Sequence, residues 1–331
     1  MVDFSADSPL PSQPPEVTST CSLSIMVART DLPFLRHTLP HLIRSCRFNF
    51  LEKVLFIDTA PLSGEKVLRP GIGTLEDLRQ CCQEFLKQQL VDRVAEIVYD
   101  PAIKTTIYRK HFARPVHPTH NYKGYPIFGT LFSLEATAGD YLLHFDSDMM
   151  FHQDPGYNWI EAGIQLLQSC PEVVAVRPLG GPPFEGIRQH QTQPDHLDPR
   201  GFYAFKFFSS RVYLIDRRRF EQLLPLPVVW RSFNNPLLDL LPSELKTLLA
   251  YGARRGCLDS WELMVSRRLE QGPWLRANLA SPQAWTLHPK ARDAAFIQAL
   301  PQIIQRIEAG DYPPEQAGYY DLKPEYWIPS P

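Results

Sequence analysis

The sequence predicts an α/β fold with a mostly parallel central sheet flanked by helices. Short apolar runs of strand length alternate with amphipathic stretches of helical length, which is typical of βαβ units. Two of the runs end in aspartate, and ligands of open α/β sheets bind at the carboxyl ends of strands. Hydrophobic residues make up 44% of the 331 residues and the net charge is −2. The chain can therefore bury a large core, and it carries no overall charge that would attract nucleic acid.

Each element follows from a local pattern. Residues 1–20 are rich in Ser and Pro, so we expect a disordered tail there. The first strand follows at 22–28 (SLSIMVA), and a helix capped by Thr30 or Asp31 runs to about Ser45. Further strands are expected at 53–59, 95–99, 141–145, 173–177 and 211–215, and further helices at 74–90, 125–138, 157–169, 217–224, 260–271 and 293–309.

One stretch, residues 103–124, concentrates positive charge. It holds Lys, Arg and His side chains and no acidic residue. A solvated loop is the plain interpretation of such a run. The alternative is a local cluster that meets phosphate charge, which the balanced net charge of the whole chain conceals.

An acidic triplet follows the strand expected at 141–145. Asp146 and Asp148 are two positions apart where the chain leaves the strand, so both carboxylates can reach one divalent cation. Mg²⁺ and Mn²⁺ bind through one or two carboxylates plus substrate phosphates. The triplet therefore favours a metal-diphosphate site, and an aspartate that only caps the next segment is the alternative.

These features resemble a family 2 glycosyltransferase with the GT-A fold, a nucleotide-sugar-dependent enzyme with a Rossmann-like sheet. The resemblance spans about Cys21 to Pro289. It implies one GT-A domain over 21–300, with 301–331 as the end of the last helix and a Pro-rich tail. The matching segments are SLSIMVARTD, VLFIDT, GYPIFGTLFSLEATAGDYLLHFDSDMMF and CLDSWELMVSRRLEQG.

The resemblance implies roles for four nucleotide-binding residues. Asp58 would contact the base or ribose of the donor, with Arg29 lining the same pocket, and Asp146 would lie by the ribose. Lys123 would present a basic group to the nucleotide. The alternatives are a turn or helix cap for Asp58 and solvated surface for Lys123.

The metal ligands implied by the resemblance are Asp146, Asp148 and His288. His288 follows the apolar residues 285–287, where GT-A enzymes often place a further ligand of the metal. A lone histidine is more often a satisfied polar group than a metal ligand.

The general base that deprotonates the acceptor hydroxyl is expected at the start of the helix at 260–271. Inverting members of the family usually carry Glu-Asp there, whereas this chain has Asp259-Ser260-Trp261-Glu262. Ser260 cannot act as a base at neutral pH. We therefore expect Asp259 to be the base, with Glu262 as second choice, and both acids could instead only stabilise the start of the helix.

The function implied is a metal-dependent, inverting, hexosyltransferase-like enzyme. Its cofactor would be Mn²⁺ or Mg²⁺, its donor a nucleoside-diphosphate sugar, and its acceptor a carbohydrate or a lipid-linked molecule. A sugar nucleotidyltransferase would carry a Gly-rich loop after the first strand, where this chain has Ala28-Arg29-Thr30-Asp31. A non-catalytic nucleotide-sugar-binding relative is the other alternative.

The compartment expected from the sequence is the cytoplasm. No run of about 18 apolar residues exists, and residues 1–20 lack the basic and apolar regions of a secretory signal. Six cysteines without a C-x-x-C pair are expected to be reduced and mostly buried. Peripheral membrane contact stays open.

Overall fold

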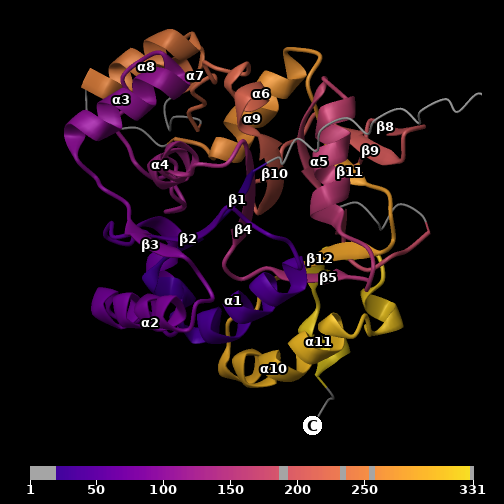
Figure 1. Cartoon of the computed structure of the whole chain (residues 1–331). Coiled ribbons are helices and arrows are strands. Elements are labelled where there is room, and N and C mark those ends of the chain that lie inside the picture. The colour runs from indigo at the N-terminus through magenta and orange to yellow at the C-terminus, as the bar shows by residue number, and fades with distance from the viewer. Residues whose placement is uncertain (1–19, 186–192, 232–235, 253–257, 329–331) are drawn as a thin grey trace, which may run out of the picture.

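The computed structural model describes residues 20–185, 193–231, 236–252 and 258–328 (Figure 1). The tail predicted at 1–20 lies, apart from Thr20, outside the described residues, and so does Cys257. The five cysteines that are described are all buried and free, as expected.

The centre of the molecule is a nine-stranded sheet. Seven strands point the same way, because only β9 and β10 run antiparallel to their neighbours. The predicted α/β class with a mostly parallel sheet is therefore confirmed. The strands lie in the order β3 (Arg93–Glu96), β2 (Glu52–Ile57), β1 (Cys21–Val27), β4 (Tyr141–Asp146), β10 (Val212–Asp216), β6 (Val173–Arg177), β11 (Leu275–Leu279), β9 (Phe202–Phe205) and β8 (His196–Asp198).

Helices cover both faces of this sheet (Figure 1). On one face, α1 (Leu32–Cys46), α2 (Leu75–Lys87) and α5 (Trp159–Ser169) share a hydrophobic cluster with the strands. Four further helices pack into a second cluster on the other face. They are α3 (Pro101–Phe112), α4 (Phe128–Ala136), α6 (Arg217–Glu221) and α9 (Trp261–Glu270).

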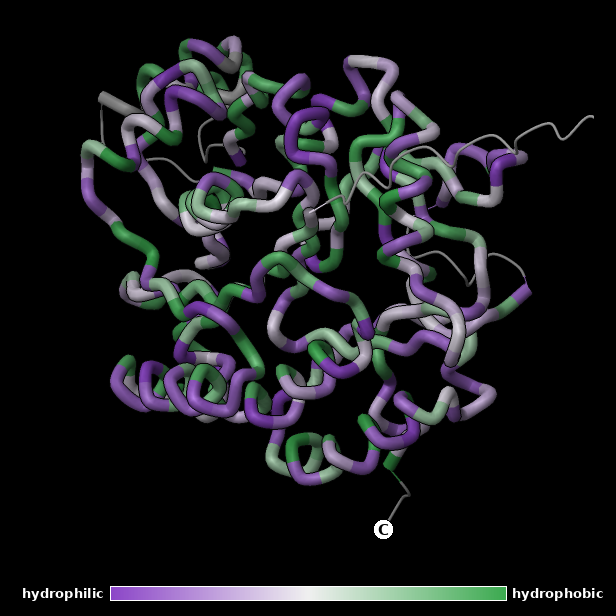
Figure 2. Tube along the Cα trace, viewed as in Figure 1, coloured by the Kyte–Doolittle hydropathy of each residue, from purple (hydrophilic) through white to green (hydrophobic). Residues whose placement is uncertain are grey.

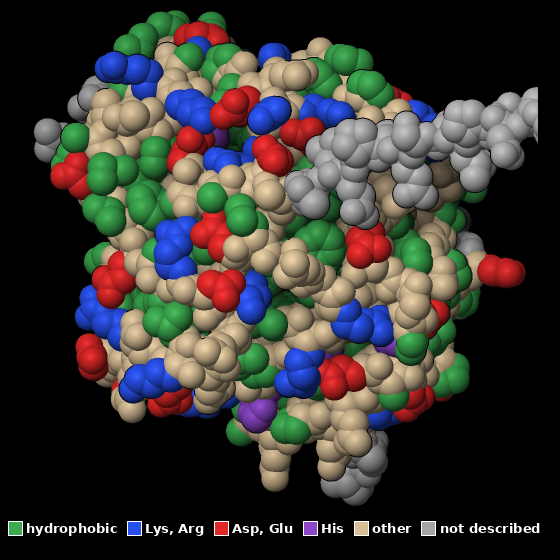
Figure 3. Space-filling view, viewed as in Figure 1, with side chains coloured by type: hydrophobic (Ala, Val, Ile, Leu, Met, Phe, Trp, Pro, Cys, Tyr) green, Lys and Arg blue, Asp and Glu red, His purple; other side chains and the backbone are tan. Residues whose placement is uncertain are grey.

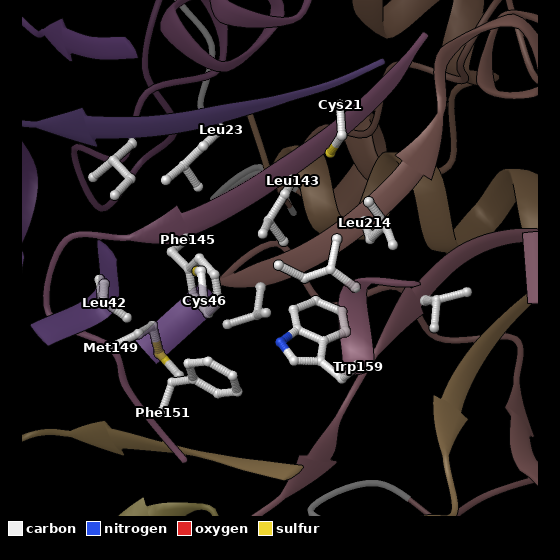
Figure 4. Packing of buried hydrophobic residues seen from close by; sticks show 14 of the residues in the cluster. Cys21, Leu23, Leu42, Cys46, Leu143, Phe145, Met149, Phe151, Trp159 and Leu214 are labelled. Carbon is white, nitrogen blue, oxygen red and sulfur yellow. The ribbon is translucent and has the colours of Figure 1, made fainter. Parts of the chain in front are cut away.

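The strands read as continuous apolar runs because both of their faces are buried. Leu143 of β4 packs into the first cluster and its neighbour Leu142 into the second. Figure 4 shows Leu143 and Phe145 on the first face, pointing toward Trp159. Burying one such side chain contributes about 1.5–3 kcal/mol. In Figure 2 the outer helices show green and purple turns, as expected of helices with one buried side.

A second, four-stranded sheet was not predicted. It joins β5 (Met150–Gln153), β12 (Ala284–Pro289) and β13 (Asp321–Leu322), with β7 (Leu179–Gly180) also paired to β12. α10 (Ala294–Glu308) packs against β5 and α1. The proline-rich end of the chain carries regular structure as well, including α11 (Pro324–Trp327), and Trp327 is buried.

The basic stretch 103–124 differs from the expected loop in its first half. There α3 begins after Asp100, whose carboxylate accepts hydrogen bonds from the backbone N–H groups of Ala102 and Ile103. Pro101 takes the first helical position, where its missing N–H does no harm. The pair Asp100-Pro101 is a sequence signal for the start of a helix, but the run of positive charge after it favoured a loop.

Two short helices, α7 (Pro236–Asp239) and α8 (Ser243–Gly252), lead toward α9. Their five exposed leucines are Leu237, Leu240, Leu245, Leu248 and Leu249. Trp230 links this pair of helices to the rest of the fold, because its indole N–H donates to Thr247 and its backbone forms a β-bridge with Leu258.

Figure 3 shows acidic and basic side chains interspersed on the visible face. No described helix is both long and apolar enough to cross a bilayer.

The contact between α3 and α4 gives a pH-dependent prediction. Glu135 lies 2.8 Å from Lys110 Nζ and 2.8 Å from His111 Nε2. Burial on its own would raise the pKa of Glu135, but these two partners lower it to about 2. The stabilisation is therefore full above the ordinary glutamate pKa of about 4, and is lost as the pH falls toward 2.

We expect Glu135→Gln to lower the free energy of unfolding by about 2 kcal/mol at pH 7, measured by urea unfolding. The difference from the parent should shrink steadily from pH 5 to pH 3. Glu161→Gln, at an exposed position on α5, is the control and should leave stability nearly unchanged. A difference at pH 3 as large as that at pH 7 would contradict the ion-pair explanation.

Candidate active site

A cavity of about 310 Å³ opens where β1, β2 and β4 end. The first residues after these parallel strands share one edge of the sheet, and polar residues from distant segments join them there. The cavity brings together all but one of the site residues expected from the sequence: Asp58, Lys123, Asp146, Asp148, Asp259, Glu262 and His288.

Arg29 is not among the lining residues. It begins a 3₁₀ turn at Arg29–Asp31, and it is Asp31 that turns inward and lines the cavity. Asp31 accepts hydrogen bonds from the backbone N–H of Ala28 (2.8 Å) and from the hydroxyl of Thr30 (3.0 Å). Burial raises the pKa of Asp31 above its ordinary value.

Asp58, directly after β2, is buried and held by three donors. Its carboxylate accepts hydrogen bonds from the Tyr99 hydroxyl (2.7 Å) and the backbone N–H of Ala60 (3.1 Å), and lies 3.1 Å from His120 Nε2. Burial alone would raise the pKa of Asp58, but His120 and Tyr99 lower it below the usual range. Asp58 therefore presents a fixed negative charge at the cavity wall.

A basic wall faces the acids. Lys66 and Arg69 lie over the ring of Tyr125, and Arg69 donates to its hydroxyl (2.7 Å). Lys123 also lines the cavity, but its ammonium is half exposed and lies 3.9 Å from Glu65. Sequence reasoning missed Lys66 and Arg69, because the short 3₁₀ helix Gly64–Leu68 and the residue after it follow no recognisable sequence pattern. Their positive charges offer contacts to an anionic ligand.

The acidic triplet forms a tight turn after β4. The backbone N–H of Met149 donates to the Asp146 carbonyl (3.1 Å), and the Asp146 N–H donates to the Arg211 carbonyl (2.7 Å). The Asp146 side chain is 46% exposed and lies near His144. Arg211, at the start of antiparallel β10, is thereby placed beside the triplet, and its Nη1 is buried without a hydrogen-bond partner.

Asp148 is the most deeply held acid of the triplet. Its Oδ2 pairs with the guanidinium of Arg292 and lies 3.9 Å from His288 Nε2. Burial on its own would raise the pKa of Asp148, but Arg292 and His288 bring it below the ordinary value. The other oxygen, Oδ1, is buried and has no hydrogen-bond partner. An ionised carboxylate with one unpaired buried oxygen is suited to a cation.

His288 is oriented by the C-terminal segment. On β12, it lies opposite Asp321 of β13, and its Nδ1 is 3.1 Å from Asp321 Oδ1. Lys290 Nζ is 2.6 Å from the other Asp321 oxygen. A carboxylate on one ring nitrogen fixes the tautomer and leaves the other as a lone-pair donor. His288 Nε2, the nitrogen not held by Asp321, thus lies 3.9 Å from Asp148 Oδ2.

The described residues contain no cluster of three or more His, Cys, Asp or Glu side chains already arranged to hold a metal ion. The donors nevertheless fit a cation that takes part of its shell from a substrate. Asp148 Oδ1 is unpaired, the Asp146 side chain is accessible, and His288 Nε2 lies 3.9 Å from the other Asp148 oxygen. Mg²⁺ and Mn²⁺ sites with few protein ligands are completed by phosphates and water.

At the start of α9, a serine caps the helix, and neither of the two acidic residues takes this role. Ser260 is the N-cap, and its hydroxyl accepts a hydrogen bond from the backbone N–H of Leu263 (3.2 Å). Glu262 accepts hydrogen bonds from the N–H and hydroxyl of Ser210 (2.9 and 3.2 Å). Among the described residues, the Asp259 carboxylate accepts a hydrogen bond only from the backbone N–H of Ser260 (2.7 Å). Asp259 therefore keeps an oxygen available at the cavity.

No family model and no curated protein sequence matches this chain. Solved structures of similar fold include GalNAc-T7, crystallised with UDP, GalNAc and Mn²⁺, with a TM-score of 0.47 and 14% sequence identity. The match covers 82% of this chain and 44% of that chain, so the chain spans less than half the length of GalNAc-T7. A likeness at this level assigns no ligand to this protein.

The basic wall depends on the close approach of two loops. A Cβ on Gly124, whose φ is +85°, would lie 2.0 Å from the Ser63 carbonyl oxygen. Gly156 has the same φ and nothing within 4 Å of its Cβ position, which makes it a matched control.

We expect Gly156→Ala to cost about 1–2 kcal/mol in unfolding free energy, from its positive φ alone. Gly124→Ala should cost at least about 2 kcal/mol more, because the loops must separate. Thermal and urea unfolding of the two variants measure the difference. Equal losses would mean that the loop contact yields without strain.

Proposed function

We propose that this protein is a metal-dependent glycosyltransferase that moves a sugar from a nucleoside-diphosphate donor to an acceptor hydroxyl with inversion. The observation that carries the proposal is the shared cavity. Acids from four segments far apart in the sequence, after β1, after β2, at the end of β4 and at the start of α9, line one space with two histidines and several basic side chains. Such a set of opposed charges suits a substrate that carries both phosphate and hydroxyl groups.

The donor would lie between Asp58 and the acidic triplet. Asp58 would accept hydrogen bonds from the nucleoside, and Lys66, Arg69 and Arg211 would meet the diphosphate charge. Asp146, Asp148 and His288 would hold a Mn²⁺ or Mg²⁺ ion. When bound, such an ion neutralises the leaving diphosphate. Arg211 supports this arrangement through its unpaired buried Nη1.

The acceptor would enter beside α9. Asp259 would take the proton of the attacking hydroxyl, since Ser260 is used as the helix cap and Glu262 is held by Ser210. Removing that proton makes the oxygen nucleophilic as it approaches the donor sugar from the face opposite the leaving diphosphate. A carbohydrate or a lipid-linked molecule would supply the hydroxyl.

A second candidate is a nucleotide-sugar-binding protein that transfers nothing. The observation in its favour is the pairing of Arg292 with Asp148, which already neutralises the carboxylate expected to hold the metal. Both candidates bind the donor, and only the glycosyltransferase converts it. Release of nucleoside diphosphate in the presence of acceptor therefore separates them.

Donor binding should depend on the metal and on Asp148. We expect UDP or GDP with Mn²⁺ to raise the melting temperature by about 2–5 °C, measured by differential scanning fluorimetry. Asp148→Asn should abolish the Mn²⁺-dependent part of this shift, because it removes the charge that holds the cation. Glu161→Gln is the control and should respond like the parent. An equal shift in EDTA would contradict a metal-assisted donor site.

Transfer should depend on Asp259 more than on Glu262. Asp259→Asn keeps the size of the side chain but cannot accept a proton, so kcat should fall by about 10²- to 10⁴-fold while the donor KM stays nearly constant. Glu262→Gln should have a smaller effect on kcat. A larger loss in Glu262→Gln than in Asp259→Asn would assign the base to Glu262.

A further inference from the structure

Two buried arginines lie side by side next to the cavity. Arg177 ends β6, and Arg276 and Asn278 lie on the neighbouring parallel strand β11. The register pairs Asn278 with Arg177, and Arg276 is two residues before Asn278, so all three side chains share one face of the sheet. It is the face opposite α5, because α5 packs on Val176 and Leu214.

All three side chains are buried and have unsatisfied polar atoms. Arg177, Arg276 and Asn278 are 5%, 4% and 4% exposed. Arg177 Nε, Arg276 Nε and Asn278 Oδ1 are inaccessible and have no hydrogen-bond partner among the described residues. Buried polar atoms are almost always paired in folded proteins, so three adjacent exceptions indicate a missing partner.

The two arginines lack a negatively charged partner. No carboxylate of the described chain lies within 4.0 Å of either guanidinium, whereas Arg200, in the turn between β8 and β9, pairs with both Asp198 and Glu172. Burial, together with the charge of Arg177, brings the pKa of Arg276 well below the ordinary arginine value. Two like charges in a poorly solvated place repel each other unless an anion joins them.

The surrounding contacts position the two guanidiniums without neutralising them. Arg276 stacks 4.0 Å from the ring centre of Phe205, and Arg177 lies 4.7 Å from that of Tyr320. Arg177 also donates to Ser209 Oγ (3.0 Å). Stacking on rings holds the planar groups in fixed orientations and leaves their edges available.

This cluster adjoins the cavity. Ser209 directly precedes Ser210 and Arg211, which both line it. The charge of Glu262, another lining residue, acts on Arg276. Tyr320 lies within electrostatic reach of Arg177 on one side and of Arg211 and Asp148 on the other. Arg177, Arg276 and Asn278 do not line the cavity themselves, and these contacts connect them to its wall.

We propose that Arg177, Arg276 and Asn278 form an anion-binding subsite that takes a carboxylate or phosphate group of the acceptor. This assignment of the acceptor class rests on the proposed function, whereas the anion site itself does not. The two guanidiniums would each donate to the oxygens of the anion, and Asn278 would turn its amide to donate through Nδ2.

The test uses inorganic phosphate, glucuronate and uncharged glucose as probes, with the full chain at constant ionic strength. UDP and Mn²⁺ are present in excess so that the diphosphate site is filled. We expect phosphate and glucuronate to raise the melting temperature by a further 2–5 °C or so, and glucose to have no such effect. Absence of any response to both anions would overturn the proposal.

Two variants locate the response. Arg276→Gln should abolish it, since one of the anion's two positively charged partners is removed. Asn278→Asp places a carboxylate between the arginines within the chain itself. It should raise the melting temperature without added anion and remove the response to phosphate. Asn278→Asp also keeps the proposal falsifiable if Arg276→Gln fails to fold.

Arg200→Gln, at an arginine already paired with acids, is the control and should keep the full response. A response that survives in Asn278→Asp would place the anion elsewhere and overturn the proposal. If phosphate stabilises the parent and not Asn278→Asp, while UDP and Mn²⁺ have no effect, the anion site stands and the glycosyltransferase proposal fails.

Discussion

The buried charge of Asp148 is the constraint on which the site depends. An ionised carboxylate in the interior is stable only when cations or hydrogen-bond donors compensate for lost water. Arg292, ahead of α10, and His288, on β12, supply that compensation. Both reach Asp148 because β5, the strand directly after the triplet, pairs with β12 and packs against α10. The architecture outside the central sheet thus serves to hold one carboxylate in place.

The first half of the fold could be predicted from sequence because its signals are local. β1, β2 and β4 are apolar runs that end in polar residues, and their parallel pairing places Asp58 and the acidic triplet at one edge. The second sheet could not be predicted in this way. β12 pairs with strands more than 100 residues earlier in the chain, and β7 and β13 are only two residues long.

The same distinction applies to the site. The acids were found because they follow strands or begin a helix, which are recognisable positions. Arg69, Arg211 and Arg292 were missed because a single arginine in a loop has no period and no fixed neighbour. Arg29 was expected in the pocket, but the short turn that begins there brings Asp31 inward instead. A shift of two residues in a 3₁₀ turn is below what sequence patterns can resolve.

The C-terminal segment has a consequence for how the protein is made. Gln316 is fully buried, and its amide binds the Tyr319 and Asp321 carbonyls and the indole of Trp327. It thereby fixes the strand that carries Asp321 beside His288. His288 consequently lacks its Asp321 partner while the ribosome still holds this segment. The nascent chain can form β1 to β4 early, but His288 on the cavity wall is oriented only when residues 316–327 have left the ribosome.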